Sequence, residues 1–146
     1  MPTRNRRSKP LSACCRYSTE ANLEDQDVYS AIGDHGFRRL VGAFYRRVAL
    51  DDLLSAMYPK DDLAGAEQRL RDFLVFRFGG PPRYIEDRGH PRLRMRHAPF
   101  PVNQAARDRW LELMTSALDE AVFAPEVRQI LMSYFESTAT AMMNRA

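Results

Sequence analysis

Four stretches of the chain repeat apolar residues at the spacing of an amphipathic helix. Gaps of three and four residues place such side chains on one helical face and leave charged residues on the other. The stretches lie within residues 34–48, 61–78, 103–121 and 125–142. Their apolar faces comprise Phe37, Leu40, Val41, Phe44, Tyr45 and Val48; Leu63, Ala66, Leu70, Phe73 and Leu74; Ala106, Trp110, Leu113, Met114, Ala117, Leu118 and Ala121; and Val127, Ile130, Leu131, Tyr134, Phe135, Thr138, Ala139 and Met142. No alternating run is long enough for a strand, so the pattern predicts an all-α fold.

Helix-breaking and capping residues separate these stretches. A short helical piece over residues 23–32 is expected to stop at Gly33, with Asp34 as the N-cap of the next helix. Further boundaries are expected at a short turn over residues 51–59 that Pro59 closes, at Asp61 or Asp62, at Gly79-Gly80-Pro81-Pro82, at Asn103 and at Pro125.

Composition and charge indicate one soluble domain preceded by a basic tail. The chain has 146 residues, and none of its apolar runs reaches the ~20 residues that a membrane span needs. Residues 1–19 carry a charge of +5 within a total of +3, so the remainder carries −2. We therefore expect residues 1–22 to be a disordered basic tail and residues 23–146 to form the domain. Cys14 and Cys15 are adjacent and lack the spacing of a zinc motif, which favours a reduced, cytoplasmic setting.

The segment from Pro81 to Pro101 is irregular and contains His97. Prolines allow only one or two helical turns, around residues 84–87 and 92–97, and compact domains rarely hold ~20 such residues without a functional reason. His97 follows a run of arginines and lies between apolar helices, which suggests an imidazole that serves a cofactor with acidic groups. Haem fits, because its iron takes a proximal histidine and its propionates pair with cations. The alternative is that His97, like most single histidines, has no special role.

Two other histidines are weaker candidates for an iron ligand. His90 precedes His97 by seven residues, and seven steps of ~100° return to nearly the same helical face, so the two cannot flank one iron. His35 precedes Tyr45 by ten residues, or ~15 Å along a helix, which is too far for it to be a routine distal ligand. His97 would then be the one protein ligand, with the opposite iron position open. Tyr45 lies on a buried stripe and needs a hydrogen-bond partner, for which a backbone carbonyl is the simplest choice.

Several motifs occur in one order at defined spacings. They are Phe44-Tyr45, Tyr58-Pro59, DDLAGAEQRLR at 61–71, Phe78-Gly-Gly-Pro81, Tyr84, RGHPRLRMRHAPF at 88–100 and Arg107-Asp-Arg-Trp110. Tyr58 follows Tyr45 by 13 residues, and Trp110 follows Tyr58 by 52. In these motifs the sequence resembles the group II truncated haemoglobins over residues 24–143, and the stretch at 88–100 is the most specific.

The resemblance implies a shortened globin in which two antiparallel helix pairs sandwich one haem b. It assigns His97 as the proximal iron ligand. It also implies that the distal polar residues over the bound gas are Tyr45, Tyr58 and Trp110. The cations that pair with the propionates would be Arg69 and Arg96. Further pocket-lining residues would be Phe44, Leu70, Phe73 and Met114. Ala66 occupies the position where many classical globins carry a distal histidine.

The leading functional hypothesis is a haem protein that binds dioxygen, carbon monoxide or nitric oxide and releases it slowly. Slow release suits sensing, nitric-oxide dioxygenase or peroxidase-like chemistry better than oxygen delivery, and a reductase would be a suitable partner. We expect a monomer or homodimer with no membrane and no nucleic-acid partner. The alternative is a cofactor-free helical module whose basic tail binds nucleic acid or an anionic surface. That alternative predicts no haem-sized pocket between the helices.

Overall fold

The computed structural model describes residues 22–146. The predicted basic tail, apart from its last residue, lies outside the described residues. The described residues form helices and connecting loops without a strand, so the all-α prediction is confirmed. The elements are the 3₁₀ turn η1 (Asp25–Asp27) and the helices α1 (Val28–Leu50), α2 (Asp52–Ser55), α3 (Leu63–Arg77), α4 (Arg83–Arg88), α5 (Leu93–His97), α6 (Gln104–Ala121) and α7 (Pro125–Ala141).

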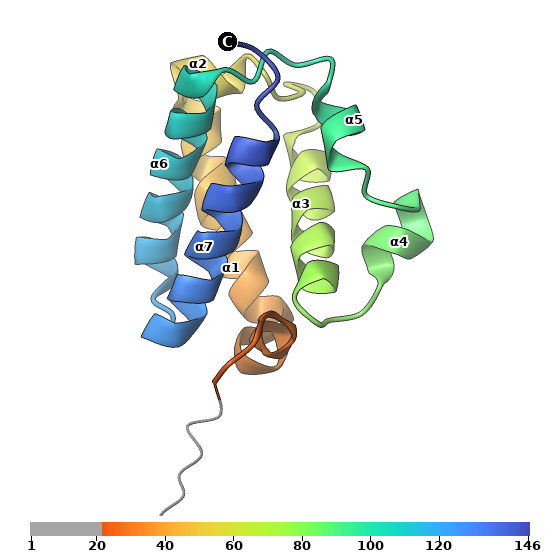
Figure 1. Ribbon diagram of the computed structural model, residues 1–146, viewed down its shortest axis with the longest axis vertical. Coiled ribbons are helices and arrows are strands. Elements are labelled where there is room, and N and C mark those ends of the chain that lie inside the picture. The colour runs from red at the N-terminus through yellow and green to blue at the C-terminus, as the bar shows by residue number, and fades with distance from the viewer. Residues whose placement is uncertain (1–21) are drawn as a thin grey trace, which may run out of the picture.

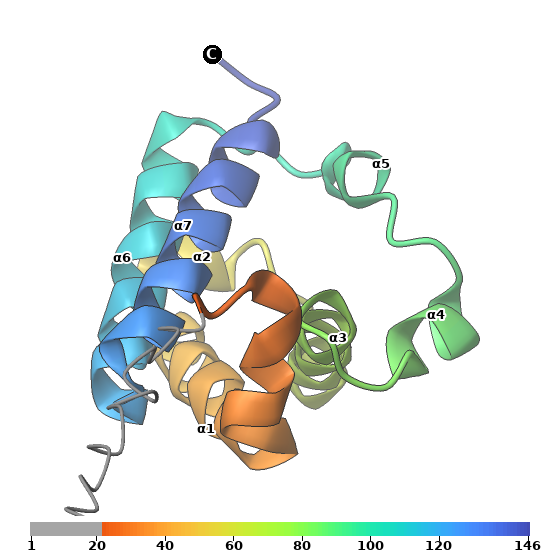
Figure 2. The ribbon, with the colours of Figure 1, turned by 60° about the horizontal axis from the view of Figure 1, so that its bottom comes forward.

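The helices form two pairs with two short helices at one side. Helices α1 and α3 pack against each other, α6 packs against α7, and α1 also packs against α6 (Figure 1). Helices α4 and α5 lie beyond α3 and are joined to the rest by extended connections (Figure 2). This is the two-on-two arrangement expected from the sequence. Within residues 22–146, none of the helices has the combined length and hydropathy that a membrane span requires.

The predicted apolar faces form the core where the pairs meet. The largest fully buried side chains include Phe37, Phe44, Phe78, Phe135, Leu40, Leu74, Met114, Leu118 and Leu131. Their removal from water is the main force that holds the helices together. Gly33 interrupts α1 with a φ of 65°, which glycine adopts without strain, so the expected break between two helical pieces is confirmed.

Most predicted boundaries coincide with capping residues. Asp62 accepts a hydrogen bond from the Gly65 N–H at 3.1 Å, and Asn103 accepts one from Ala106 at 2.9 Å. Each bond satisfies a backbone donor that the first helical turn leaves free. Gly79 ends the α3 region with a φ of 95° beside the Gln26 backbone, where a side chain would collide.

The expectation for Asp34 is wrong. Its carboxylate does not cap the helix, but instead accepts two hydrogen bonds from Arg83 of α4, at 2.7 and 3.0 Å, and one from the Tyr29 hydroxyl at 3.0 Å. The bond from Arg83 lowers the pKa of Asp34. A charged bidentate partner is a stronger competitor for a carboxylate than a backbone N–H.

Asp51 links three helices at the end where the cavity described below is built. Its buried carboxylate accepts a hydrogen bond from the Leu54 N–H at 2.8 Å, which caps α2. It also pairs with Arg109 of α6 at 2.7 Å. The bond from Leu54, followed by that from Arg109, lowers the pKa of Asp51 below its ordinary value of 3.8. The carboxylate therefore stabilises the fold above that value, and the contribution is lost as pH falls through the lower folded pKa.

We expect Asp51→Ala to lower the free energy of unfolding by about 1–2 kcal/mol through loss of the cap alone. Asp51→Asn should cost less at neutral pH, because asparagine caps equally well and removes only the charge. The difference between wild type and Asp51→Asn should shrink as pH falls from about 5 toward 3. Urea unfolding at several pH values measures both. A constant difference across that range would show that the charge of Asp51 does not stabilise the fold.

Candidate functional site

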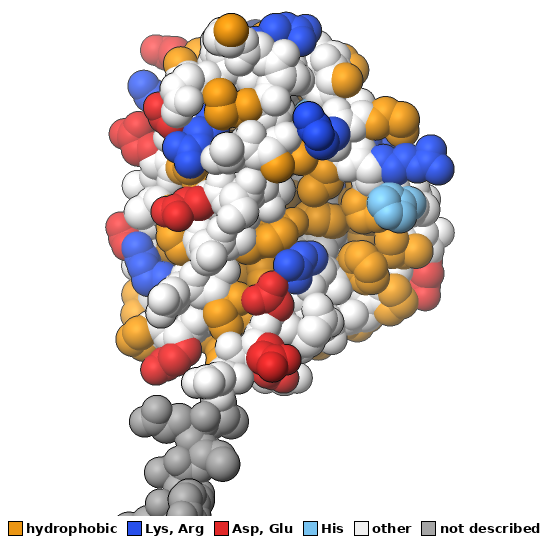
Figure 3. All heavy atoms as spheres, viewed as in Figure 1, with side chains coloured by type: hydrophobic (Ala, Val, Ile, Leu, Met, Phe, Trp, Pro, Cys, Tyr) orange, Lys and Arg blue, Asp and Glu red, His pale blue; other side chains and the backbone are white. Residues whose placement is uncertain are grey.

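A cavity of about 480 Å³ lies among α3, α5, α6 and α7. Its volume is within the range of about 300–1,000 Å³ that small-molecule sites usually have. The walls are mainly apolar and include Leu54, Met57, Leu70, Phe73, Leu93, Phe100, Phe135, Ala139 and Met142. One histidine, four arginines, four tyrosines, one tryptophan and one threonine add polar groups to this wall. Figure 3 shows the apolar hollow on the face between α7 and the α4–α5 side.

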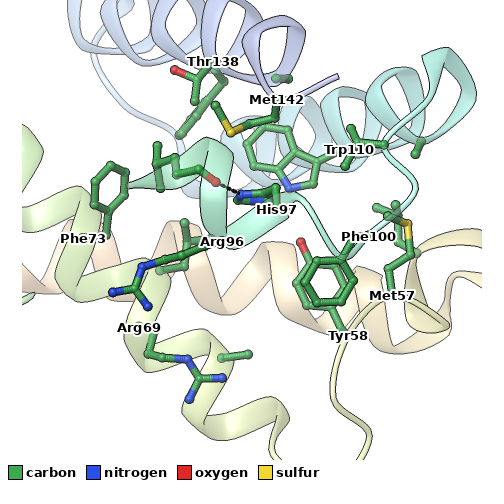
Figure 4. Close-up of a pocket in the computed structure, with 18 of the residues that line it drawn as sticks. Met57, Tyr58, Arg69, Phe73, Arg96, His97, Phe100, Trp110, Thr138 and Met142 are labelled. Carbon is green, nitrogen blue, oxygen red and sulfur yellow. Dashed lines mark hydrogen bonds between the residues drawn. The ribbon is translucent and has the colours of Figure 1, made fainter. Parts of the chain in front are cut away.

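His97 is the one histidine on the wall, among the described residues, and its ring is fixed. Its Nδ1 lies 2.7 Å from the Leu93 carbonyl oxygen one turn earlier in α5 (Figure 4). A carbonyl can only accept, so Nδ1 carries the proton and Nε2 keeps its lone pair for a metal. A backbone carbonyl on the other ring nitrogen is the usual way in which a metal-binding histidine is oriented. His35 and His90 are exposed and do not line the cavity, and His90 Nδ1 accepts a hydrogen bond from the Arg92 N–H at 3.2 Å.

Side chains far from His97 in the sequence hold the loop that follows it. Asn144, beyond α7, donates to the His97 carbonyl at 3.1 Å and to the Phe100 carbonyl at 3.0 Å. Its side-chain oxygen accepts from the Val102 N–H at 3.0 Å. Asn144 therefore anchors the C-terminal end of α5, a role that no periodicity in the sequence could reveal.

Tyr45, Tyr58 and Trp110 come together on one part of the cavity wall. The Tyr45 and Tyr58 rings meet edge to face with centroids 5.6 Å apart. Trp110 is held between the rings of Phe44 at 5.2 Å and Phe135 at 5.5 Å. Three residues separated by up to 65 positions in the sequence thus lie on the wall of one cavity.

The hydroxyl groups of this cluster are protonated donors. Burial raises the pKa of Tyr45, and it raises the pKa of Tyr58 to about 12 although hydrogen bonding with Trp110 opposes the rise. The Tyr45 hydroxyl forms no hydrogen bond within residues 22–146, so the backbone-carbonyl partner considered for it is not found. Ala66 also lines the cavity and offers no donor. The donors that this cluster offers to a small ligand are therefore phenol and indole groups.

Arg69 and Arg96 lie on the other side of the cavity (Figure 4). Arg96 donates to the Pro91 carbonyl at 2.8 Å and to the Arg88 carbonyl at 3.1 Å, and its guanidinium lies 5.9 Å from the Tyr84 ring centroid. It pairs with no carboxylate among residues 22–146. Arg69 forms a partly exposed ion pair with Asp62 at 3.1 Å. Both cations can thus meet an anionic group at the cavity edge.

Two predicted pocket residues lie behind the wall. Phe44 and Met114 have no exposed surface and belong to the hydrophobic core, and neither lines the cavity. Phe44 precedes Tyr45 by one residue, which turns its side chain by about 100° toward the ring of Trp110. Leu70 and Phe73 do line the cavity. Tyr84, which was not assigned to the pocket, also lines it and meets the Phe73 ring edge to face at 5.4 Å.

The described residues form no cluster of side chains that could hold a metal ion without further ligands. Within residues 22–146 there is no group of three or more His, Cys, Asp or Glu side chains that could hold a metal ion. A metal at His97 would need most of its ligands from elsewhere, and the planar tetrapyrrole of haem supplies four nitrogen ligands.

Comparisons with known proteins agree with this geometry. A model of the family described as bacterial-like globin matches residues 27–144. The group 2 truncated haemoglobin YjbI of Bacillus subtilis is 41% identical over 117 residues, which cover 80% of this chain and 88% of that protein. Two-on-two hemoglobin-3 of Arabidopsis thaliana is 36% identical, with 80% of this chain and 69% of that protein covered.

Solved structures show the same relationship. The haemoglobin of Chloroflexus aurantiacus matches with a TM-score of 0.78 and 49% identity, covering 81% of this chain and 98% of that one. The truncated oxygen-avid haemoglobin of Bacillus subtilis matches with a TM-score of 0.77 and 41% identity, covering 80% and 98%. The chain therefore belongs to the bacterial-like globin family, as a truncated haemoglobin of group II.

Proposed function

We propose that this protein binds haem b through His97 Nε2 and retains a diatomic gas, dioxygen in the first place, on the opposite side of the haem. The observation that carries the proposal is the hydrogen bond between His97 Nδ1 and the Leu93 carbonyl. It leaves one imidazole nitrogen free in a cavity whose walls divide into a donor cluster and a cationic edge. A cytoplasmic setting agrees with this function.

The residues present fit the cofactor. Apolar side chains suit the porphyrin ring, whose transfer from water into the cavity is favourable. Arg69 and Arg96 would pair with the propionates, and Arg96 is held for this by two backbone carbonyls rather than by a carboxylate. The cavity also counts against the cofactor-free helical module, which predicted no such pocket.

When bound, haem supplies a ferrous iron that can take a diatomic gas. The protein then determines how long the gas stays. Tyr45, Tyr58 and Trp110 would donate hydrogen bonds to it, each contributing about 0.5–1.5 kcal/mol, so two or three slow release by one to several powers of ten. Raised pKa values keep both tyrosines protonated at physiological pH, as donors must be.

Tight retention favours sensing, nitric-oxide oxidation or peroxide chemistry over oxygen delivery. The described relative from Bacillus subtilis is called oxygen-avid, in line with this expectation. The cavity wall lacks a distal histidine, since Ala66 lies in that region, and a general base for peroxide cleavage would have to be another group. We therefore rank retention of dioxygen, with nitric oxide as its natural reaction partner, above peroxidase-like turnover.

We expect His97→Ala to lose most of its haem, because no other histidine of the described residues lines the cavity. His97→Gly should regain haem when imidazole is added, since the free ligand can occupy the vacated space. Soret absorbance relative to protein concentration measures both, with His90→Ala as the matched control that keeps its haem. Full haem occupancy in His97→Ala without added imidazole would contradict the assignment of His97.

The three distal donors are expected to differ in how strongly they retain dioxygen. An indole N–H cannot rotate, and Trp110 is held between two aromatic rings, so Trp110→Phe should accelerate dioxygen release by about 10-fold, the effect of ~1.4 kcal/mol. Tyr45→Phe and Tyr58→Phe should have smaller effects, because either hydroxyl can reorient to replace the other. Because the pKa of Tyr58 is about 12, release from the parent should be constant between pH 7 and pH 10. Stopped-flow dissociation rates test the ranking, and a tyrosine variant that releases faster than Trp110→Phe would reverse it.

Two arginines on the short helix α5 are expected to differ in their effect on haem retention. Arg96→Gln should increase the rate of haem loss several-fold, because a propionate would lose its cation. Arg94→Gln should not, since Arg94 is exposed and does not line the cavity. Haem transfer to an excess of an apo-globin acceptor measures the rate. Equal rates in the two variants would remove Arg96 from the haem site.

A further inference from the structure

Positive charge is concentrated on one segment of the fold. Residues 22–146 carry 17 basic and 18 acidic side chains, a net charge of −1. Residues 88–107 hold five arginines and no carboxylate, so the rest of the described chain carries −6. Four of the five lie within nine residues, namely Arg88, Arg92, Arg94 and Arg96.

These four arginines lack acidic partners. None of them pairs with a carboxylate among residues 22–146, whereas eight arginines elsewhere in that range do. Four arginines within nine residues, with no acid among them, concentrate positive charge on this segment. Like charges repel one another, so an anionic partner from outside the described residues would stabilise the cluster.

The haem accounts for only part of the cluster. Arg88 and Arg96 line the cavity and can face the propionates. Arg92 and Arg94 are exposed and lie outside the cavity wall. Their charges are therefore open to a partner that approaches from solvent.

Apolar side chains stand exposed beside these cations. Met95 is 60% exposed and Phe100 is 39% exposed, two of the five large apolar side chains with high exposure in residues 22–146. Basic side chains and a histidine lie next to apolar atoms over the α4–α5 side in Figure 3. Arginine and methionine are enriched in protein–protein interfaces, which combine an apolar centre with a charged rim.

We propose that Arg92, Arg94, Met95 and Phe100 form a docking surface, here called the α5 surface, for an acidic one-electron donor protein. The proposal rests on the proposed function, because Arg88, Arg96 and Phe100 place this surface against the wall of the haem cavity. A docked donor would give up one electron and be oxidised, and the ferric iron would be reduced to ferrous. No atom or proton is transferred in this step.

Charge distribution favours an acidic protein over a membrane or a nucleic acid. An extended polyanion would also face the remaining −6 of the described domain and be repelled by it. A globular partner with a local acidic patch would meet only the α5 surface. Complementary patches of this kind raise the association rate and fix the orientation of the partner.

The test is reduction of the full-length, haem-loaded ferric protein by a reduced acidic [2Fe–2S] ferredoxin in a stopped-flow instrument under carbon monoxide. Arg92→Gln/Arg94→Gln should lower the second-order rate constant about 10-fold at low salt and flatten its dependence on ionic strength. The same substitutions should weaken the ferredoxin affinity measured by calorimetry. Arg38→Gln/Arg71→Gln removes the same charge elsewhere and should leave both quantities near the parent values.

Other outcomes would overturn the proposal. Equal slowing in both double variants would show that net charge alone acts, and unchanged rates would show that the α5 surface does not dock the donor. Weaker binding of Arg92→Gln/Arg94→Gln to anionic vesicles or duplex DNA, with ferredoxin kinetics unchanged, would assign the surface to a polyanion. Carbon monoxide binding to the dithionite-reduced parent distinguishes failure of the docking surface from failure of the proposed function. If carbon monoxide binds normally but the ferredoxin kinetics do not depend on Arg92 and Arg94, only the docking surface is rejected. If carbon monoxide does not bind, the proposed function is rejected.

Discussion

The orientation of the His97 ring is the constraint on which the site depends. The Leu93 carbonyl fixes which nitrogen faces the cavity, but α5 has five residues and is too short to be stable alone. It is held at both ends by side-chain bonds. Arg96 donates to the carbonyls of Arg88 and Pro91 before α5, and Asn144, more than 40 residues away, donates to those of His97 and Phe100. The bonds of Arg96 and Asn144 thus position an imidazole that a five-residue helix alone could not hold.

The cavity also separates two kinds of polar chemistry that would interfere if mixed. Neutral donors from α1, the loop after α2 and α6 gather at one side, and guanidinium groups from α3 and α5 lie at the other. Low polarity between them strengthens each interaction and keeps the tyrosines neutral. The arginines without carboxylate partners among the described residues lie both at the cavity edge, as Arg96 does, and on the exposed surface of α5, as Arg94 does. One arginine-rich segment can therefore serve both an internal anionic group and an external partner.

Much of the fold could be predicted because helical periodicity is local. The breaks at Gly33 and Gly79 and the caps at Asp62 and Asn103 follow from short-range chemistry. Asp34 failed as a cap because Arg83, 49 residues away, takes its carboxylate. Phe44 and Met114 were placed on the cavity wall because a stripe of apolar residues does not show which edge of the stripe faces a neighbouring helix. Asn144 could not be found at all, since its three bonds exist only after the chain end meets α5.

The most direct test of the central assignment is resonance Raman spectroscopy of the ferrous, gas-free protein. In a variant with His35→Gln and His90→Gln, ¹⁵N-labelled histidine introduces the isotope only at His97. An iron–imidazole stretching band that moves to lower frequency on labelling is the expected result, because His97 Nε2 would be the proximal ligand. A band whose frequency does not change on labelling, or the absence of such a band in haem-loaded protein, would contradict the assignment of His97 as the proximal ligand.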